Sequence, residues 1–279
     1  MVTGATDGIG KATAKIFAQK GAILILVARN LEKGKKTIKE IIEQTKNSKI
    51  EFIQADLSVQ KNIWHVVEKF KEKYNHLDIL VNNVGGFYSE RIETPDGYEL
   101  TFALNYLCPF LLTNLLLDSL KSSNQARIIN ITSSAHRYGK IHLKDLQLKN
   151  NFFGLKAYQQ SKLAIVIFTK YLAKKLQNYS ITVNSIHPGI VKTNIARQHN
   201  GIQEKVFKLI KKTIAIPSET AAQYITYLAI SKKVSSISGE CFVRGKIRKT
   251  SKQSNDEKLA EKLWNISLNL TNLTNFLSS

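Results

Sequence analysis

Cysteine is scarce in this sequence, which contains only Cys108 and Cys241. The two lie far apart and match no metal-ligand spacing, so we expect reduced thiols and no metal site. A run of about 18 apolar residues, long enough to span a bilayer, is also missing, and no secretory signal precedes the first motif. We therefore expect a cytoplasmic protein whose core needs neither a disulfide nor a metal.

Acidic residues are outnumbered, with 21 Asp and Glu against 41 Lys and Arg and a net charge of +20. Such a balance attracts phosphates, acidic partners or anionic membranes. The lysines are spread along stretches of helical periodicity, as on solvated helix faces, and no arginine-rich tract or nucleic-acid motif occurs. We expect no nucleic-acid partner.

Short β-branched runs alternate with helix-period stretches along most of the 279 residues. The predicted strands are Ile23–Ala28, Ile50–Ala55, Ile79–Asn82, Arg127–Ile131 and Ile181–Ile186. The predicted helices are Lys11–Gln19, Leu31–Gln44, Lys61–Tyr74, Gly97–Leu120 and Lys156–Leu176. This alternation predicts an α/β fold in one domain, residues 1–279, with a doubly wound parallel sheet and helices on both faces.

The carboxy-terminal part of the sequence has a different pattern. Ser235–Val243 is interpreted as a final strand, Gly245–Asn255 as a basic loop, and 256–270 as a helix that Asp256 can cap. The segment 194–217 combines apolar residues at helical spacing with many lysines, and we expect it to determine substrate specificity. It is a helix that packs on the core, an amphipathic lid over a lipophilic substrate, or a weak membrane contact.

A glycine-rich turn stands directly before the first helical stretch and reads Thr3-Gly4-Ala5-Thr6-Asp7-Gly8-Ile9-Gly10. Glycines permit a tight turn and let the backbone approach a pyrophosphate, while the amides and dipole at the helix start favour its charge. Structural turns share this composition. Its place before a helix, and the polar residues at later strand ends, favour a dinucleotide site.

Those later strand ends carry Arg29, the pair Asp56-Leu57, and the run Asn82-Asn83-Val84-Gly85. Dinucleotide folds that prefer NAD place an acidic residue at the second strand end, whereas an arginine suits the 2′-phosphate of NADP. Asp56 can accept from the adenine amino group, and the small residues of the last run leave room for a cofactor. Because parallel strands end at one sheet edge, these residues predict a shared crevice that prefers NADP(H) to NAD(H).

The candidate catalytic residues begin with Tyr158 and Lys162, which stand four residues apart in a helical pattern and so share one face. A nearby ammonium lowers the pKa of a phenol, and Lys162 can also donate to a ribose. Ser133, with Ser134 as the alternative, ends a strand at the same edge and can orient a substrate oxygen. Asn105 is either a satisfied core amide or the holder of a water that links Lys162 to solvent.

In this order and spacing the motifs resemble the short-chain dehydrogenase/reductase family, and within it the retinol-dehydrogenase-like branch. The segments that carry the resemblance are Thr3–Gly10, Asp56-Leu57, Asn82–Gly85, Asn105, Asn130–Ser133, Tyr158–Lys162, His187–Thr193, Ala135-His136 and Lys262–Trp264. Val84 departs from the usual alanine and adds bulk near the cofactor.

The resemblance implies a Rossmann-type fold and a role for each motif residue. Tyr158 would be the acid/base, Lys162 its pKa modifier and a ribose ligand, Ser133 rather than Ser134 the carbonyl orienter, and Asn105 a relay. The implied cofactor-binding residues are Thr3, Gly4, Thr6, Asp7, Gly8, Ile9, Gly10, Arg29, Asp56, Leu57, Asn83, Val84, Gly85, Tyr158, Lys162, Pro188, Gly189, Val191 and Thr193.

Together these features predict an NADP(H)-dependent oxidoreductase that interconverts a lipophilic alcohol with an aldehyde or ketone. The alternative is a non-catalytic NADP-binding protein that senses redox state. The resemblance also suggests a homodimer through Lys156–Leu176, and the basic amphipathic segment a peripheral membrane contact. His136, His142 and His187 form no metal set and are interpreted as packing or surface residues.

Overall fold

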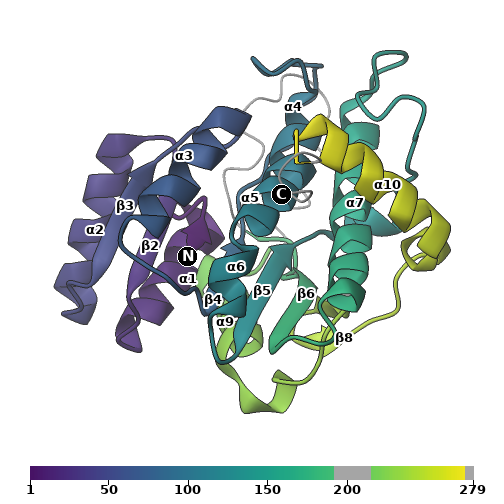
Figure 1. Ribbon diagram of the computed structural model, residues 1–279. Helices are drawn as coiled ribbons and strands as arrows, with labels where there is room; N and C mark the ends of the chain where they lie inside the picture. Colours follow the sequence, from purple (N-terminus) through teal and green to yellow (C-terminus); the bar gives the residue numbers. More distant parts are fainter. Residues whose placement is uncertain (192–214, 274–279) are drawn as a thin grey trace.

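The computed structural model describes residues 1–191 and 215–273, and these form one sheet with helices around it (Figure 1). The sheet has the order β3-β2-β1-β4-β5-β6-β7-β8, and neighbours are parallel except for the β7/β8 hairpin. The strands are β1 (Val2–Thr3), β2 (Leu24–Ala28), β3 (Ile50–Gln54), β4 (Ile79–Asn82), β5 (Ala126–Ile131), β6 (Ile181–His187), β7 (Cys241–Val243) and β8 (Lys246–Ile247). The predicted doubly wound α/β sheet is therefore confirmed.

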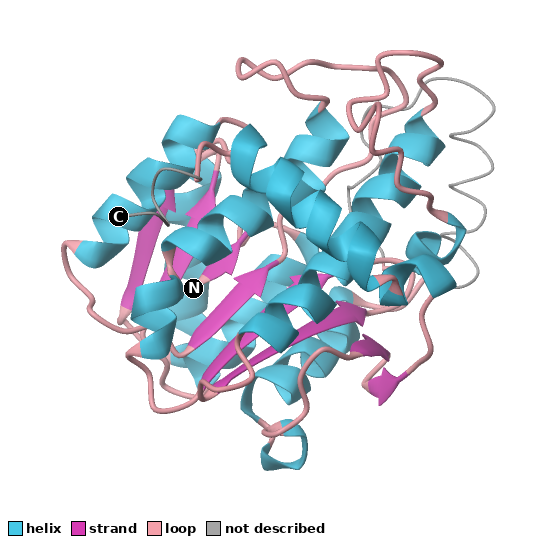
Figure 2. Ribbon diagram, turned by 45° about the vertical axis from the view of Figure 1, so that its right-hand side comes forward, coloured by secondary structure: helices cyan, strands magenta, loops and turns pink. Residues whose placement is uncertain are grey.

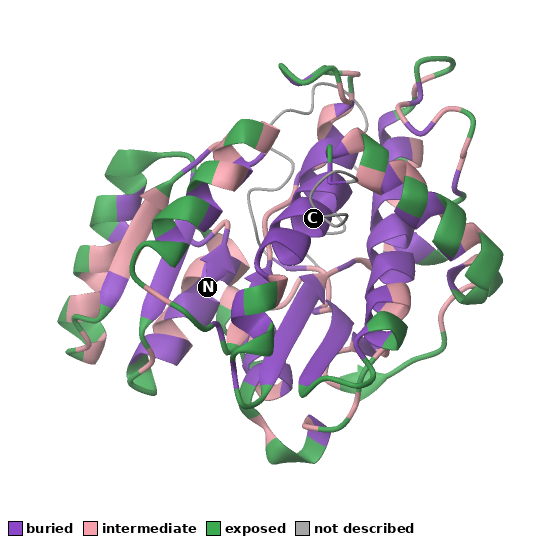
Figure 3. Cartoon of the chain, viewed as in Figure 1, coloured by how far each residue is buried: buried purple, intermediate pink, exposed green. Residues whose placement is uncertain are grey.

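Helices cover both faces of this sheet, as Figure 2 shows. One face carries α1 (Gly8–Gln19), α2 (Leu31–Thr45) and α9 (Ser218–Ile230), whose apolar residues pack in one cluster. The other face carries α3 (Gln60–Lys71), α5 (Cys108–Leu115) and α7 (Gly154–Lys175), whose apolar residues belong to a second cluster. In β2, Leu26 packs on the first face and Ile25 on the second, since strand side chains alternate. Burial on both faces explains why β2 is a continuous apolar run, whereas the edge strand β3 is only partly buried (Figure 3).

The predicted helix Gly97–Leu120 is wrong as a single helix. The structure divides it into α4 (Leu100–Phe102), a π-helical turn η1 (Ala103–Leu107), α5 and α6 (Leu117–Lys121). Pro109 is the physical reason, because it has no N–H to donate to the carbonyl of Asn105 four residues earlier. A wider turn replaces that bond, in which the Cys108 amide donates to the carbonyl of Ala103.

The strand predicted at Ser235–Val243 is also shorter than expected. Only Cys241–Val243 pairs in the sheet, because the preceding residues form a loop that passes through Gly239 at φ +80°. The predicted loop Gly245–Asn255 instead contains β8 and a short 3-10 helix at Lys252–Asn255.

The carboxy-terminal helix α10 (Glu257–Leu270) confirms the predicted helix, and Asp256 caps it by accepting from the Leu259 amide at 3.0 Å. It lies across α5 and α7 (Figure 1). Its Trp264 ring packs 5.0 Å from the ring of Phe110 and 6.0 Å from that of Phe168, measured between centroids. The middle of α7, residues 161–169, is buried on all sides. A dimer through α7 would therefore have to displace α10.

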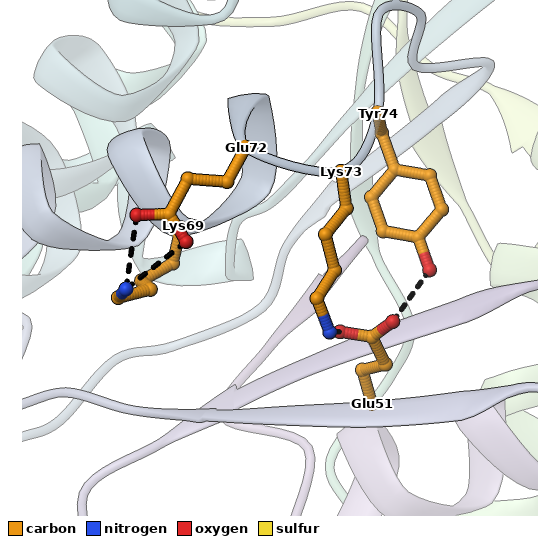
Figure 4. Close-up of polar contacts among 5 residues, drawn as sticks. All are labelled: Glu51, Lys69, Glu72, Lys73 and Tyr74. Atoms are coloured by element: carbon orange, nitrogen blue, oxygen red, sulfur yellow. Dashed lines mark hydrogen bonds and ion pairs between the residues drawn. The ribbon is translucent and has the colours of Figure 1, made fainter.

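A polar cluster ties the edge strand β3 to the chain that follows α3 (Figure 4). The carboxylate of Glu51 accepts from Lys73 Nζ and from the Tyr74 hydroxyl, both at 2.8 Å. These hydrogen bonds hold the pKa of the Glu51 carboxyl below its usual value. Lys73 and Tyr74 are free to turn toward the strand because α3 ends at Lys71, three residues before the predicted end at Tyr74. The cluster thus joins β3 to the end of α3 on one face of the sheet.

Candidate active site

The glycine-rich turn joins β1 to α1 at the carboxyl edge of the sheet. Gly4 and Gly8 have φ angles of +65° and +51°, which residues with a side chain rarely adopt. A Cβ atom on Gly10 would lie 2.3 Å from the carbonyl oxygen of Gly4, so only glycine lets helix and turn come so close. Asp7 caps α1 by accepting from the Gly8 amide at 2.8 Å. The turn thus presents backbone and a helix N-terminus to the crevice, as a pyrophosphate requires.

Thr3 and Asn83 hold this turn in place. The Thr3 hydroxyl oxygen accepts from the amides of Asn83 and Val84, both at 3.0 Å. The Asn83 side-chain amide donates to the carbonyls of Thr3, at 2.8 Å, and Gly4, at 3.2 Å. Both side chains therefore shape the crevice by joining the ends of β1 and β4.

Arg29 and Asp56 meet at the outer end of the crevice. Arg29 follows β2 and Asp56 follows β3, and their charged groups are 3.8 Å apart. The Arg29 side chain is 78% exposed, so its guanidinium is accessible to a ligand. Asp56 is held by Ser58, whose amide and hydroxyl donate to the same carboxylate oxygen at 3.0 and 2.7 Å. Tyr88, which was not predicted for the site, lies near both charges. Burial raises the pKa of its phenol, and the charges of Arg29 and Asp56 also act on that pKa.

Ser133, Tyr158 and Lys162 come together where β5 ends against α7. The Ser133 side chain lies close enough to the Tyr158 phenol to act on its pKa. Lys162 Nζ lies 5.7 Å from the centroid of the Tyr158 ring and donates to the carbonyl of Ile131 at 3.1 Å. Ser134 is exposed, which supports the choice of Ser133. The structure thus brings together the three side chains that the sequence singled out for catalysis.

Burial sets the protonation of this group. It raises the pKa of Tyr158, and the Ser133 side chain opposes that shift. It also lowers the pKa of Lys162 to about 8. The sequence prediction named Lys162 as the group that lowers the Tyr158 pKa, but the causes that act on this phenol are burial and Ser133.

Asn105 lies in the π-helical turn, and its side chain is fully hydrogen-bonded. Its Oδ1 accepts from the Gly86 amide, and its Nδ2 donates to the Gly86 carbonyl and to the Ser161 hydroxyl, all at 2.9 Å. The side chain is therefore the satisfied core amide of the two alternatives. A relay to Lys162 stays a prediction.

Phe87 is a functional candidate that the sequence prediction missed. Its ring meets the Tyr158 ring edge to face, with centroids 5.5 Å apart and an interplanar angle of 76°. It follows Gly85 and Gly86 at the end of β4, so its position directly after a glycine pair at a strand end was the available signal. The ring thus places an apolar surface beside the Tyr158 phenol.

The segment after β6 is described only in part. Gly189 has φ +116°, and Ile216 donates through its amide to the Ile190 carbonyl at 2.8 Å, which closes the loop. Thr193 and most of the predicted specificity segment, residues 194–214, lie outside the described residues. Within the described residues no group of three or more His, Cys, Asp or Glu could hold a metal ion, and no helix is long and apolar enough to cross a bilayer.

Comparison with known proteins gives these features a context. The sequence profile of the family described as short chain dehydrogenase matches residues 1–203. Retinol dehydrogenase 13 of Homo sapiens is 40% identical over 279 residues, which cover 98% of this chain and 84% of that protein. Polyprenol dehydrogenase of Homo sapiens is 35% identical over 277 residues, which cover 97% of this chain and 84% of that protein.

Solved structures share the fold. A crystal structure of an uncharacterized protein from Mycobacterium Paratuberculosis superimposes with a TM-score of 0.77 and 27% identity, over 97% of this chain and 91% of that one. A short chain dehydrogenase from Burkholderia cenocepacia, solved in complex with NADP, has a TM-score of 0.68 and 24% identity, over 91% of this chain and 96% of that one.

Proposed function

Since this chain belongs to the short-chain dehydrogenase family, within its retinol-dehydrogenase-like branch, we propose that it is an NADP(H)-dependent oxidoreductase that interconverts a lipophilic alcohol with its aldehyde or ketone. The observation that carries the proposal is the cluster of Ser133, Tyr158 and the buried Lys162, which lies at the same sheet edge as the glycine-rich turn. A protein that only sensed NADP would need the glycine-rich turn and no phenol beside a lysine, so the sensor alternative is not favoured.

The residues of the crevice fit a dinucleotide. Glycines leave room that a Cβ would fill, the start of α1 offers amides to a pyrophosphate, and Lys162 can donate to a ribose hydroxyl. The bound nicotinamide would supply or accept the hydride. The chain supplies the rest of the reaction through positioning and acid–base catalysis, the latter worth roughly 10²–10⁴-fold.

In reduction, Tyr158 donates its phenolic proton to the substrate oxygen, while Ser133 holds that oxygen by a hydrogen bond. In oxidation, Tyr158 takes the proton back from the alcohol. The raised pKa of Tyr158 keeps the phenol protonated at neutral pH, so the proton is present, although its release is harder than from a free phenol. The charge of Lys162 then favours the phenolate that remains, and so supports the transfer in either direction.

The preference for NADP(H) is proposed from Arg29. Its exposed guanidinium can pair with a 2′-phosphate at the end of β2, where NAD-dependent folds carry a carboxylate. The next residue, Asn30, has no carboxylate either. Its side chain caps α2 by accepting from the Lys33 amide at 2.8 Å.

The lipophilic substrate is proposed from the relatives and from Phe87. The relatives are named for retinol and polyprenol, which are long apolar alcohols. The Phe87 ring, packed against Tyr158, can contact an apolar chain at the point where the oxygen would react. From the sequence we also propose a cytoplasmic location with peripheral membrane contact. Cell fractionation before and after a carbonate wash tests both.

The decisive experiment is a panel of apolar and polar alcohols, aldehydes and ketones, assayed with both NADPH and NADH. We expect turnover of apolar carbonyls, with NADPH preferred. Tyr158→Phe serves as the matched control, because it keeps the ring and removes the proton. It should bind NADPH as the wild type does and lose nearly all turnover. Comparable turnover in that variant would remove the phenol from the mechanism.

A further inference from the structure

His136 lies directly behind the catalytic serine and is buried, with 1% of its surface exposed. It belongs to the 3-10 helix η2 (Ser134–Tyr138), whose first turn Ser133 caps by accepting from the Ala135 amide at 3.3 Å. His136 donates twice to the Ser133 carbonyl, through its backbone amide at 3.1 Å and through Nδ1 at 2.6 Å. The shorter of these bonds is made by the side chain.

The chemistry of that bond fixes the state of the imidazole. A carbonyl oxygen only accepts, so Nδ1 carries the proton and Nε2 is left with a lone pair. Nε2 is buried and has no hydrogen-bond partner within the described residues. A charged ring would bury a second, unpaired N–H, and burial accordingly lowers the pKa of His136. The ring is therefore neutral and has one defined donor.

Stability alone does not account for a histidine at this position. A leucine of similar volume would fill the space without the cost of a buried nitrogen that lacks a partner. Residues that break such a local rule gather at functional sites, where they hold another group in place. The group that His136 holds is the backbone of Ser133, whose side chain lies beside the Tyr158 phenol and acts on its pKa.

We propose that His136 is a positioning residue that sets the Ser133 hydroxyl toward Tyr158 and the substrate oxygen. Its two donors anchor the Ser133 carbonyl, and this fixes the backbone from which the serine side chain projects. The far end of η2 is equally confined, because a Cβ atom on Gly139 would lie 2.4 Å from the Gln159 carbonyl of α7. Both ends of η2 are thus fixed, one by His136 on Ser133 and the other by the close packing of Gly139 on α7. This inference rests on the proposed function, since it assigns a partner to the catalytic serine.

The test is a double-mutant cycle between His136→Leu and Ser133→Ala. His136→Leu removes the Nδ1 donor and should lower kcat by about 10–100-fold, the range expected for one well-placed hydrogen bond. Its KM for NADPH should stay within about two-fold of the wild type, since the glycine-rich turn is untouched. Added to Ser133→Ala, it should cause no further loss, because the group through which it acts is gone.

Two further measurements separate positioning from general support of the fold. His136→Asn keeps a donor near the Nδ1 position and should restore kcat to within about three-fold of the wild type. His136→Leu should melt at or above the wild-type temperature despite its lower kcat, because the unpaired buried nitrogen is gone.

The inference would be overturned if the losses of kcat in the two single variants multiplied in the double variant. It would also be overturned if His136→Asn lost as much kcat as His136→Leu. A lower melting temperature in His136→Leu with a proportionate loss of activity would overturn it as well. The proposed function fails separately, if the wild type turns over no carbonyl or if Tyr158→Phe remains fully active.

Discussion

Lys162 donates a hydrogen bond of 3.1 Å to the carbonyl of Ile131, the last residue of β5, and no ion pair of the described residues includes this buried ammonium. Its pKa is accordingly lowered from 10.5 to about 8. A charge buried on a neutral acceptor favours function at the expense of stability, because burial penalises the charged form that catalysis uses.

Lys162→Met should therefore give a protein that is inactive but more stable at pH 7. Removing the buried charge should raise the free energy of unfolding by about 3 kcal/mol, the equivalent of this pKa shift. Losing the hydrogen bond to Ile131 should lower it by about 1 kcal/mol. Because the folded pKa is the lower one, the unfolded chain holds more protons between about pH 8 and 10.5, and wild-type stability rises with pH over that window. The measurement is urea unfolding of both proteins from pH 7 to 10.5. The advantage of Lys162→Met should shrink as pH rises, whereas a constant difference would contradict the assignment.

Gly85→Ala should damage the site from the side of the β4 loop. A Cβ atom there would lie 2.6 Å from Asn105 Oδ1, and three hydrogen bonds hold that amide in place. We expect a loss of about 1–3 kcal/mol in the free energy of unfolding and a raised KM for NADPH. The check is chemical denaturation of Gly85→Ala in the wild-type and Asn105→Ser backgrounds. The loss in the free energy of unfolding caused by Gly85→Ala should be smaller in the Asn105→Ser background, because serine is shorter and makes room for the methyl group. An equal loss in both backgrounds would show that Asn105 is not the obstacle.

Trp264→Ala should loosen α10 from the body of the protein. The indole is 7% exposed and packs against Phe110, Phe168 and Tyr171, so its removal should cost about 3–5 kcal/mol. The exposed apolar surface of α5 and α7 should then favour self-association, which analytical ultracentrifugation would detect as a dimer absent from the wild type. Leu268→Ala on the same helix, a smaller and only partly buried side chain, is the milder control. A wild-type protein that is already dimeric through α7 would refute this view of α10.

The parts of the fold that follow from local pattern were predicted well. β4 begins and ends where predicted, and β2, β3, β5 and β6 differ by one residue at one end, because each contains a short run rich in β-branched residues. The helix around Asn105 was predicted wrongly because an apolar run conceals a π-helical turn, although Pro109 was a visible signal for the break.

The candidate site divides in the same way. Ser133, Tyr158 and Lys162 were predictable because a strand end and one helix face must meet at the carboxyl edge of a parallel sheet. Phe87 was missed although it follows a glycine pair at a strand end, and His136 could not be found, since its contact with Ser133 is defined only by the folded chain. His136 in particular was interpreted as an ordinary packing residue, because nothing in the sequence shows which atom its imidazole contacts.

Arg29→Glu should reverse the cofactor preference. The change replaces the cation proposed for the 2′-phosphate with a carboxylate that can accept from ribose hydroxyls. We expect kcat/KM with NADPH to fall by about 30–100-fold, equivalent to about 2–3 kcal/mol, while kcat/KM with NADH stays level or rises. The expected loss is moderate because the Arg29 side chain is exposed, so water and salt screen its interaction with the 2′-phosphate.

Lys71→Glu, an equal charge change at the exposed end of α3, is the matched control and should leave the NADPH/NADH ratio unchanged. Raising the salt concentration should narrow the gap between wild type and Arg29→Glu with NADPH, since the lost interaction is electrostatic. If both charge-reversed variants lost NADPH activity equally, the preference would come from the net charge of +20 and not from Arg29.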